Sequence, residues 1–91
     1  MNDWAAWTTG GIFSGHGGAL TDEVGVITGE LSVHTTWVEG RADITVQYVG
    51  SSDWYTLSGS PVLAADEETA REVHQRAVEA VKQGGAARAP S

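Results

Sequence analysis

The chain has 91 residues, of which 41% are hydrophobic and 19% are charged, and it contains no cysteine. A chain of this length supports one small core and no second domain. No run approaches eighteen apolar residues, which excludes a transmembrane helix, and the composition is typical of a soluble globular domain. The lack of cysteine excludes a disulfide framework, a thiolate nucleophile and a sulfur-ligated zinc site.

The charge is strongly acidic, with five Lys and Arg against twelve Asp and Glu, a net charge of -7. Such a surface repels a phosphate backbone, so we expect no direct binding of nucleic acid. The first residues show neither a basic segment nor a continuous apolar segment, which favours a cytoplasmic protein without a signal peptide or membrane anchor. The abundance of Ala and Gly, with Arg preferred over Lys, is typical of a bacterial source.

The first part of the chain predicts a strand over Trp4–Phe13, which we expect to pair with residues 24 to 30 across a glycine-rich connection. Residues 10 to 18 include five glycines. They lack the lysine-containing ending and the glycine order of phosphate-binding loops, so they predict a mobile or tightly turning connection.

Residues 24 to 59 are rich in Val, Thr, Ile, Trp and Tyr, which predicts short antiparallel strands. A two-residue loop at Glu39 and Gly40, or a four-residue loop over residues 38 to 41, pairs Trp37 with Ala42 in either case, and this register sorts the hairpin into two faces. One face is almost wholly apolar and carries Leu31, Val33, Trp37, Ile44, Val46 and Tyr48. The other carries Glu30, Ser32, His34, Thr36, Asp43, Thr45, Gln47 and Val49.

A second loop within residues 50 to 53 adds a third strand to this meander. It sets Tyr48 opposite Tyr55 and Val46 opposite Leu57. Trp54 then falls on the polar face of the hairpin, beside Val49.

The period changes after Asp66, which is a good N-cap for a helix over residues 67 to 83. Its apolar face comprises Ala70, Val73, Ala77, Ala80 and Val81, with His74 and Val78 beside them. We therefore predict an α+β fold: an antiparallel sheet of about four strands followed by one C-terminal helix packed on one face of the sheet. The compact domain spans residues 1–83 and residues 84–91 form a disordered tail. This order of elements resembles that of sheet-plus-helix binding modules, including some that bind single-stranded DNA through basic faces that this chain lacks.

Nothing in the sequence predicts catalysis, a metal site or a cofactor. The three histidines, His16, His34 and His74, lack the spacing of metal ligands. His34 is expected to be an exposed strand residue and His74 a packed, hydrogen-bonded one. Ser14 and His16 lie close to Asp22 and Glu23 without the pattern of a nucleophile elbow, so we expect no enzyme.

The aromatic residues are the best functional signal, since each large ring buries much apolar area. Trp37 is expected in the core. Trp54 and Val49, on the uncovered face, are the expected anchors of a partner-binding surface, with Glu30 and Asp43 as acids at its rim. Trp4 and Trp7 are further candidates, and on a strand their spacing points them to opposite faces.

The function predicted from these features is a small acidic protein-interaction module that binds itself, as a symmetric homodimer, or another protein. One alternative is an acidic inhibitor that imitates a polyanion and blocks a basic groove of a nucleic-acid enzyme or a toxin. Another is a small-ligand binder with a pocket between sheet and helix, lined by Trp37 and Tyr55.

Overall fold

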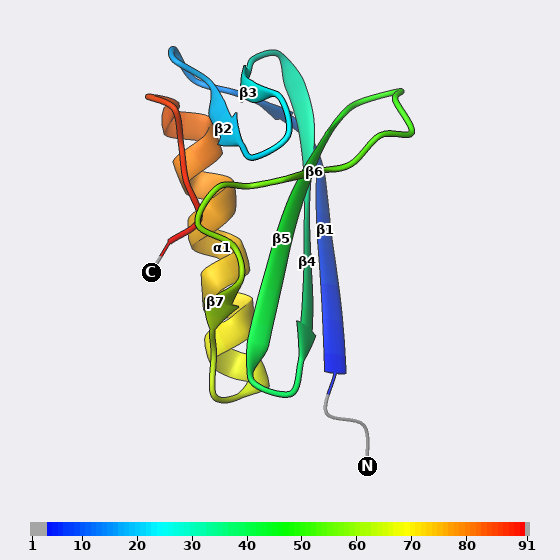
Figure 1. Ribbon diagram of the computed structural model, residues 1–91, viewed down its shortest axis with the longest axis vertical. Helices are drawn as coiled ribbons and strands as arrows, with labels where there is room; N and C mark the ends of the chain where they lie inside the picture. Colours follow the sequence, from blue (N-terminus) through cyan, green and yellow to red (C-terminus); the bar gives the residue numbers. More distant parts are fainter. Residues whose placement is uncertain (1–3, 91) are drawn as a thin grey trace.

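The computed structural model describes residues 4–90, which form an antiparallel sheet with one helix packed on it (Figure 1). The main sheet has the strand order β1-β4-β5-β6, with β7 also paired to β5, and β2 and β3 form a separate two-stranded sheet. The elements are β1 (Trp4–Phe13), β2 (Ala19–Thr21), β3 (Gly25–Ile27), β4 (Glu30–Val38), β5 (Arg41–Tyr48), β6 (Tyr55–Thr56), β7 (Val62–Leu63) and α1 (Glu67–Gln83). The predicted α+β class, a sheet followed by a C-terminal helix on one face, is confirmed.

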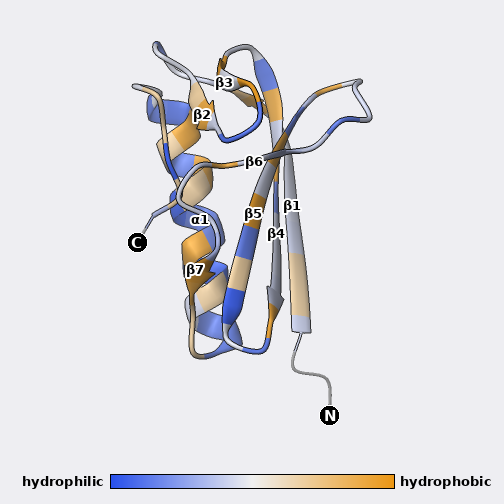
Figure 2. Cartoon of the chain, viewed as in Figure 1, coloured by the Kyte–Doolittle hydropathy of each residue, from blue (hydrophilic) through white to orange (hydrophobic). Residues whose placement is uncertain are grey.

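The central hairpin has the register that the alternation of side chains predicts. Leu31 pairs with Tyr48, Val33 with Val46 and Trp37 with Ala42. Glu39 and Gly40 both have positive φ, 49° and 80°, as a two-residue primed turn requires. Apolar and polar residues alternate along β5, and this register places the apolar ones on the buried face (Figure 2).

The register of β6 differs from the prediction by two residues. Val46 pairs with Tyr55, where the sequence predicted Leu57. The reason is that six residues, 49–54, separate β5 from β6, which is longer than the turn we expected. A shift of two keeps every side chain on its predicted face, because strand side chains alternate with period two.

Strand β1 exists as predicted, but its predicted partner is wrong. It pairs with β4 along almost its whole length, from Trp4 opposite Val38 to Phe13 opposite Glu30. Residues 25–27 instead form β3, which pairs with β2, because the chain folds back on itself in the turn of residues 22–24. Of the predicted partner segment, only Glu30, the first residue of β4, lies opposite β1. The glycines of β1 mark a bulge between Thr9 and Ile12, and Gly11 has φ 67°.

Helix α1 begins and ends where the sequence predicts. The Asp66 side chain accepts a hydrogen bond from the Thr69 backbone N–H at 2.8 Å, and Gly84 follows the last turn. The buried face of the helix comprises Ala70, Val73, His74, Ala77, Val78 and Val81. It covers a sheet face whose core includes Leu31, Ile44 and Trp37, and the Trp37 indole N–H donates to the Ala64 carbonyl at 2.9 Å.

Residues 84–90, which we expected to be disordered, lie against the rest of the chain. Backbone N–H groups of Gly85, Ala86 and Ala87 donate to the carbonyls of residues 16–18, at distances from 2.7 to 2.9 Å. Ala87 is 7% exposed. Residues 84–90 therefore pack against the core. Ser91 of the predicted tail and residues 1–3 of the predicted domain lie outside the described residues.

Among residues 4–90, no helix has the length and apolar character that crossing a bilayer requires.

Candidate interaction face

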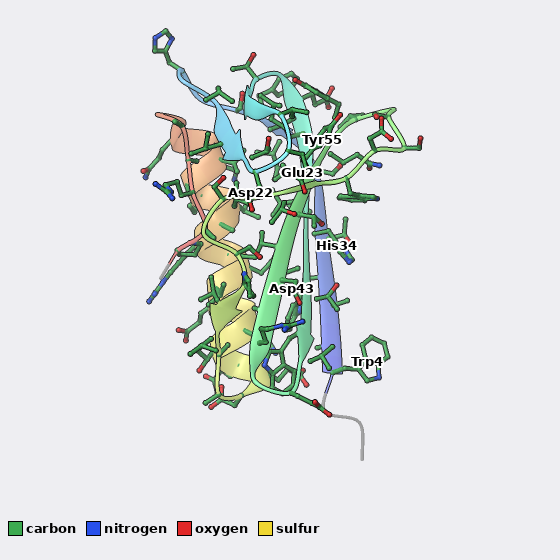
Figure 3. All side chains as sticks on the ribbon, in the orientation of Figure 1. Trp4, Asp22, Glu23, His34, Asp43 and Tyr55 are labelled. Atoms are coloured by element: carbon green, nitrogen blue, oxygen red, sulfur yellow. The ribbon has the colours of Figure 1, made fainter. Side chains whose placement is uncertain are left out.

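No element of residues 4–90 covers the side of the main sheet that faces away from α1, and the segment between β5 and β6 projects on that side (Figure 1). We call this side the open face. The side chains of Trp4 and His34 point outward from it (Figure 3). By strand alternation and register it carries Trp4, Ala6, Thr8, Phe13, Glu30, Ser32, His34, Thr36, Val38, Arg41, Asp43, Thr45, Gln47, Val49, Trp54, Thr56 and Leu63.

Exposed apolar side chains lie at the two ends of the open face. Of the nine large hydrophobic residues that are exposed in the described chain, six belong to it. The hairpin-end cluster lies near the turn between β4 and β5 and consists of Trp4, Val38 and Leu63. The loop-end cluster lies near the segment between β5 and β6 and consists of Phe13, Val49 and Trp54. Such a concentration of exposed apolar side chains is typical of an interaction surface.

A band of hydroxyl-bearing residues around His34 separates the two clusters. The His34 ring bonds Thr8 Oγ1 through Nδ1 at 2.6 Å and Thr36 Oγ1 through Nε2 at 3.1 Å. These polar atoms already satisfy one another, so a partner that covers the band leaves few of them without a hydrogen bond.

Trp54 links the loop-end cluster to this band. Its ring centroid lies 5.6 Å from that of His34, with the planes tilted by 52°, and the residue is 44% exposed. The observed register moves Trp54 two residues along β5 from the predicted position beside Val49. The predicted anchors Trp54 and Val49 thus both lie exposed on the open face, at the same end.

The second histidine occupies the opposite side of the same two strands. His74 of α1 bonds Thr9 Oγ1 of β1 at 2.9 Å and Thr35 Oγ1 of β4 at 2.7 Å. It is 4% exposed, and burial, with a smaller contribution from His34, lowers its pKa from the ordinary value. The two histidines therefore each join β1 to β4, one on either face of the sheet.

Trp4 and Trp7 point to opposite sides, as their spacing predicts for a strand. Trp4 is 56% exposed on the open face. Trp7 is half-buried on the helix side, where its ring stacks on His74 at a centroid distance of 6.3 Å. Only the first of the two rings belongs to the candidate face.

The charged residues of the open face are Glu30, Arg41 and Asp43, which together carry a net charge of -1. The Glu23 carboxylate lies at the edge of the face, where it is bonded to Thr56. Arg41 Nε lies 3.5 Å from Asp43 Oδ2, an exposed pair of little energetic weight. The predicted rim residues Glu30 and Asp43 are thus present, but most of the acidity lies elsewhere.

Two further acids hold the β2–β3 turn to the end of the sheet. Glu23 accepts hydrogen bonds from the hydroxyl and the backbone N–H of Thr56, both at 2.7 Å, and these bonds lower its pKa. Asp22 accepts a hydrogen bond from the Ser58 hydroxyl at 2.7 Å. These carboxylates have structural partners (Figure 3).

Over residues 4–90, no group of three or more His, Asp or Glu side chains is placed to hold a metal ion. The Ser14 hydroxyl accepts a hydrogen bond from the Gly29 backbone N–H at 3.0 Å, and His16 lies exposed on the following turn.

A hollow of about 330 Å³ lies between α1 and β1, and its lining includes Thr9, His74 and Val78. Trp37, which we considered for a ligand pocket, is buried in the core.

Sequence reasoning did not single out three members of the clusters: Phe13, Val38 and Leu63. Val38 was available from the hairpin register, since it has the same parity as His34. Phe13 reaches the open face because the bulge in β1 reverses the alternation, and Leu63 does so because β7 joins β5. Neither event has a local signal strong enough to place these side chains.

Comparison of the chain with protein-family models, with curated proteins and with solved structures found no match to any of them.

Proposed function

We propose that this protein is a non-enzymatic interaction module whose open face binds another protein surface, in the first place the open face of a second copy. The observation that carries the proposal is the arrangement of the face, with two exposed apolar clusters on either side of a polar band whose members bond one another. This arrangement provides apolar area for association without leaving many buried polar groups unpaired.

The open face is complementary to itself. A two-fold axis through the polar band and across the strands brings the hairpin-end cluster of one protomer onto the loop-end cluster of its partner. Apolar side chains then meet apolar side chains, and band meets band. The low charge of the face supports the same partner, because two copies meet with a net charge of -1 each in the contact.

The size of the face fits a modest dimer. The three long strands β1, β4 and β5 cover roughly 30 Å by 14 Å, and the short strands β6 and β7 add a partial fourth strand, so each protomer contributes about 500 Å². Two protomers bury about 1,000 Å² in total, which is at the lower limit of specific interfaces. We therefore expect a dissociation constant on the order of micromolar.

The test introduces a charge at equally exposed valines on and off the face. Val49 is 49% exposed on the open face, and Val26, in β3, is 51% exposed away from it. Val49→Asp is expected to weaken self-association about tenfold or more in sedimentation equilibrium, because it would bury an unpaired carboxylate. Val26→Asp, as the matched control, is expected to leave it unchanged.

Trp54→Ala provides a second variant, with an expected loss of about tenfold to a hundredfold in affinity, as for a buried aromatic anchor. Circular dichroism checks that each variant keeps its fold. The proposal is contradicted if the wild-type chain remains monomeric at all concentrations, or if Val26→Asp weakens association as much as Val49→Asp does.

A further inference from the structure

We propose that the outer edge of β1 is a separate self-association site, at which β1 of a second copy adds as an antiparallel strand with Trp7 opposite the partner's Trp7. This contact uses backbone hydrogen bonds along the edge of the sheet. It is independent of the open face and extends the main sheet across two protomers.

The first observation is that β1 is a long unpaired edge. It has ten residues and pairs with β4 alone among the strands of residues 4–90. Its sequence, WAAWTTGGIF, holds no proline, and no Lys, Arg, Asp or Glu lies between Asp3 and Asp22 in a chain with seventeen such residues. Natural sheet edges of this length normally carry charges or prolines that prevent strand addition.

The second observation is the contrast with the opposite edge of the sheet. There, the two-residue strands β6 and β7 lie along β5, and Pro61 precedes β7. Short strands and proline are devices that block strand addition. One edge of this protein is therefore protected and the other is not, so pairing through β1 stops at two copies.

The third observation is that the regular part of β1 is complementary to itself. The strand is regular before its bulge, which begins after Thr9. With Trp7 at the two-fold axis, Ala6 lies opposite the partner's Thr8 and Ala5 opposite the partner's Thr9. Each small residue of one strand then faces a larger residue of the other, and residues that face each other lie on the same side of the joined sheet.

The helix side of the edge leaves space for the joined strands. Trp7 is half-buried there, and the hollow of about 330 Å³ lined in part by Thr9 and Val78 lies beside it. In the proposed pair the two Trp7 rings approach each other next to these hollows. Each ring thereby loses the water-exposed part of its surface, which favours association.

The experiment uses the natural lack of cysteine. Ala6→Cys and Thr8→Cys chains, mixed in equal amounts and oxidised mildly, are expected to form a mixed disulfide dimer about tenfold or more faster than Ala6→Cys mixed with Ser52→Cys, an exposed loop position. Residues paired across antiparallel strands lie close enough to form a disulfide. Residues on two sheets stacked through their open faces do not, because stacked sheets lie about 10 Å apart. Mass spectrometry identifies which chains are joined.

A mixed dimer that forms no faster than the control, or homodimers that outnumber it, would overturn the proposal. A second measurement uses the Val49→Asp background, in which the open face is blocked. There, the edge contact is expected to leave a dimer, and the Ala6→Cys and Thr8→Cys pair is expected to form the mixed disulfide at an unchanged rate. Loss of all association in Val49→Asp, together with no specific disulfide, removes the edge contact while the open face proposal stands. Full association in Val49→Asp together with the specific disulfide does the reverse.

Discussion

His34 and His74 bind the two neighbouring strands β1 and β4 from opposite faces of the sheet. Each ring contacts one threonine from each strand, Thr8 and Thr36 on the open face, Thr9 and Thr35 on the helix side. The arrangement follows from alternation, since two adjacent threonines in a strand point to opposite sides. Strand β1, which is paired on one side only, thus gains two side-chain hydrogen bonds, one from Thr8 to His34 of β4 and one from Thr9 to His74 of α1.

The buried member of this pair gives a prediction for stability. Replacing His74 with Ala removes the partner of the Thr35 hydroxyl, which is fully buried, and leaves a cavity beside Trp7. We expect the free energy of unfolding to fall by about 2–4 kcal/mol in urea denaturation. The exposed His16 serves as control, with a change within about 0.5 kcal/mol for its alanine variant. Equal losses for both variants would contradict the structural role of His74.

The same residue gives a pH dependence. In the unfolded chain His74 takes up a proton near its ordinary pKa of 6.5, whereas burial lowers the pKa in the folded protein. The unfolded state therefore binds more protons below about pH 6.5, and stability falls as the pH decreases from there through the folded pKa. We expect the difference in unfolding free energy between wild type and His74→Ala to shrink over this range. The measurement runs from about pH 8 to about pH 5, on either side of the ordinary histidine pKa. A difference in unfolding free energy that stays constant over this range would contradict the lowered pKa of His74.

At the scale of elements, the end of α1 and the turn of residues 15–18 approach each other so closely that glycine is required. A Cβ atom on Gly15 would lie 2.4 Å from the backbone oxygens of Lys82 and Gln83. The Gly15 backbone N–H also donates to the Val81 carbonyl at 2.9 Å, which satisfies a carbonyl at the helix end. The glycine-rich segment is thus a tight connection that positions the helix.

This contact predicts different outcomes for two glycines. Gly15→Ala is expected to lower the free energy of unfolding by about 1–3 kcal/mol or more, because backbone atoms must shift to admit the methyl group. Gly10→Ala is the matched control. Neither glycine has positive φ, and a Cβ on Gly10 meets only Ser32 Oγ at 3.4 Å. We expect a change of about 0.5–1 kcal/mol at most for the control, in either direction, by thermal or chemical denaturation. Similar losses at both positions would contradict the close approach.

The accuracy of the sequence predictions differs between elements for a physical reason. The β4–β5 hairpin was predicted in full because a two-residue turn and the alternation of apolar residues fix its register over a short distance. The β6 register was wrong by two residues because a six-residue loop does not fix how far the next strand slides. The face of Trp54 was nevertheless right, since parity survives a shift of two.

At the scale of the whole molecule, the negative net charge of each copy opposes the proposed self-association. Two copies with a net charge of -7 each repel at long range, although the open face itself is nearly neutral. Added salt screens this repulsion, so we expect the self-association constant to rise several-fold between about 20 mM and 500 mM salt. An acidic inhibitor that occupies a basic groove would show the opposite dependence, with binding that weakens as salt rises. Sedimentation across this salt range measures the sign, and association that weakens with salt would contradict the self-docking face.

The sequence by itself determined the elements and the faces: a sheet with one apolar side, a helix from Asp66 to Gly84 that covers it, and a bare side with Trp54. These follow from periodicity, capping and turn chemistry, which act between residues close in the chain. Only the tertiary structure decided that β1 pairs with β4, that residues 84–90 lie against the core, and that His34 and His74 occupy the two faces of the same strands. These depend on which backbone groups and side chains meet across long separations in sequence, and local composition leaves several such partners open.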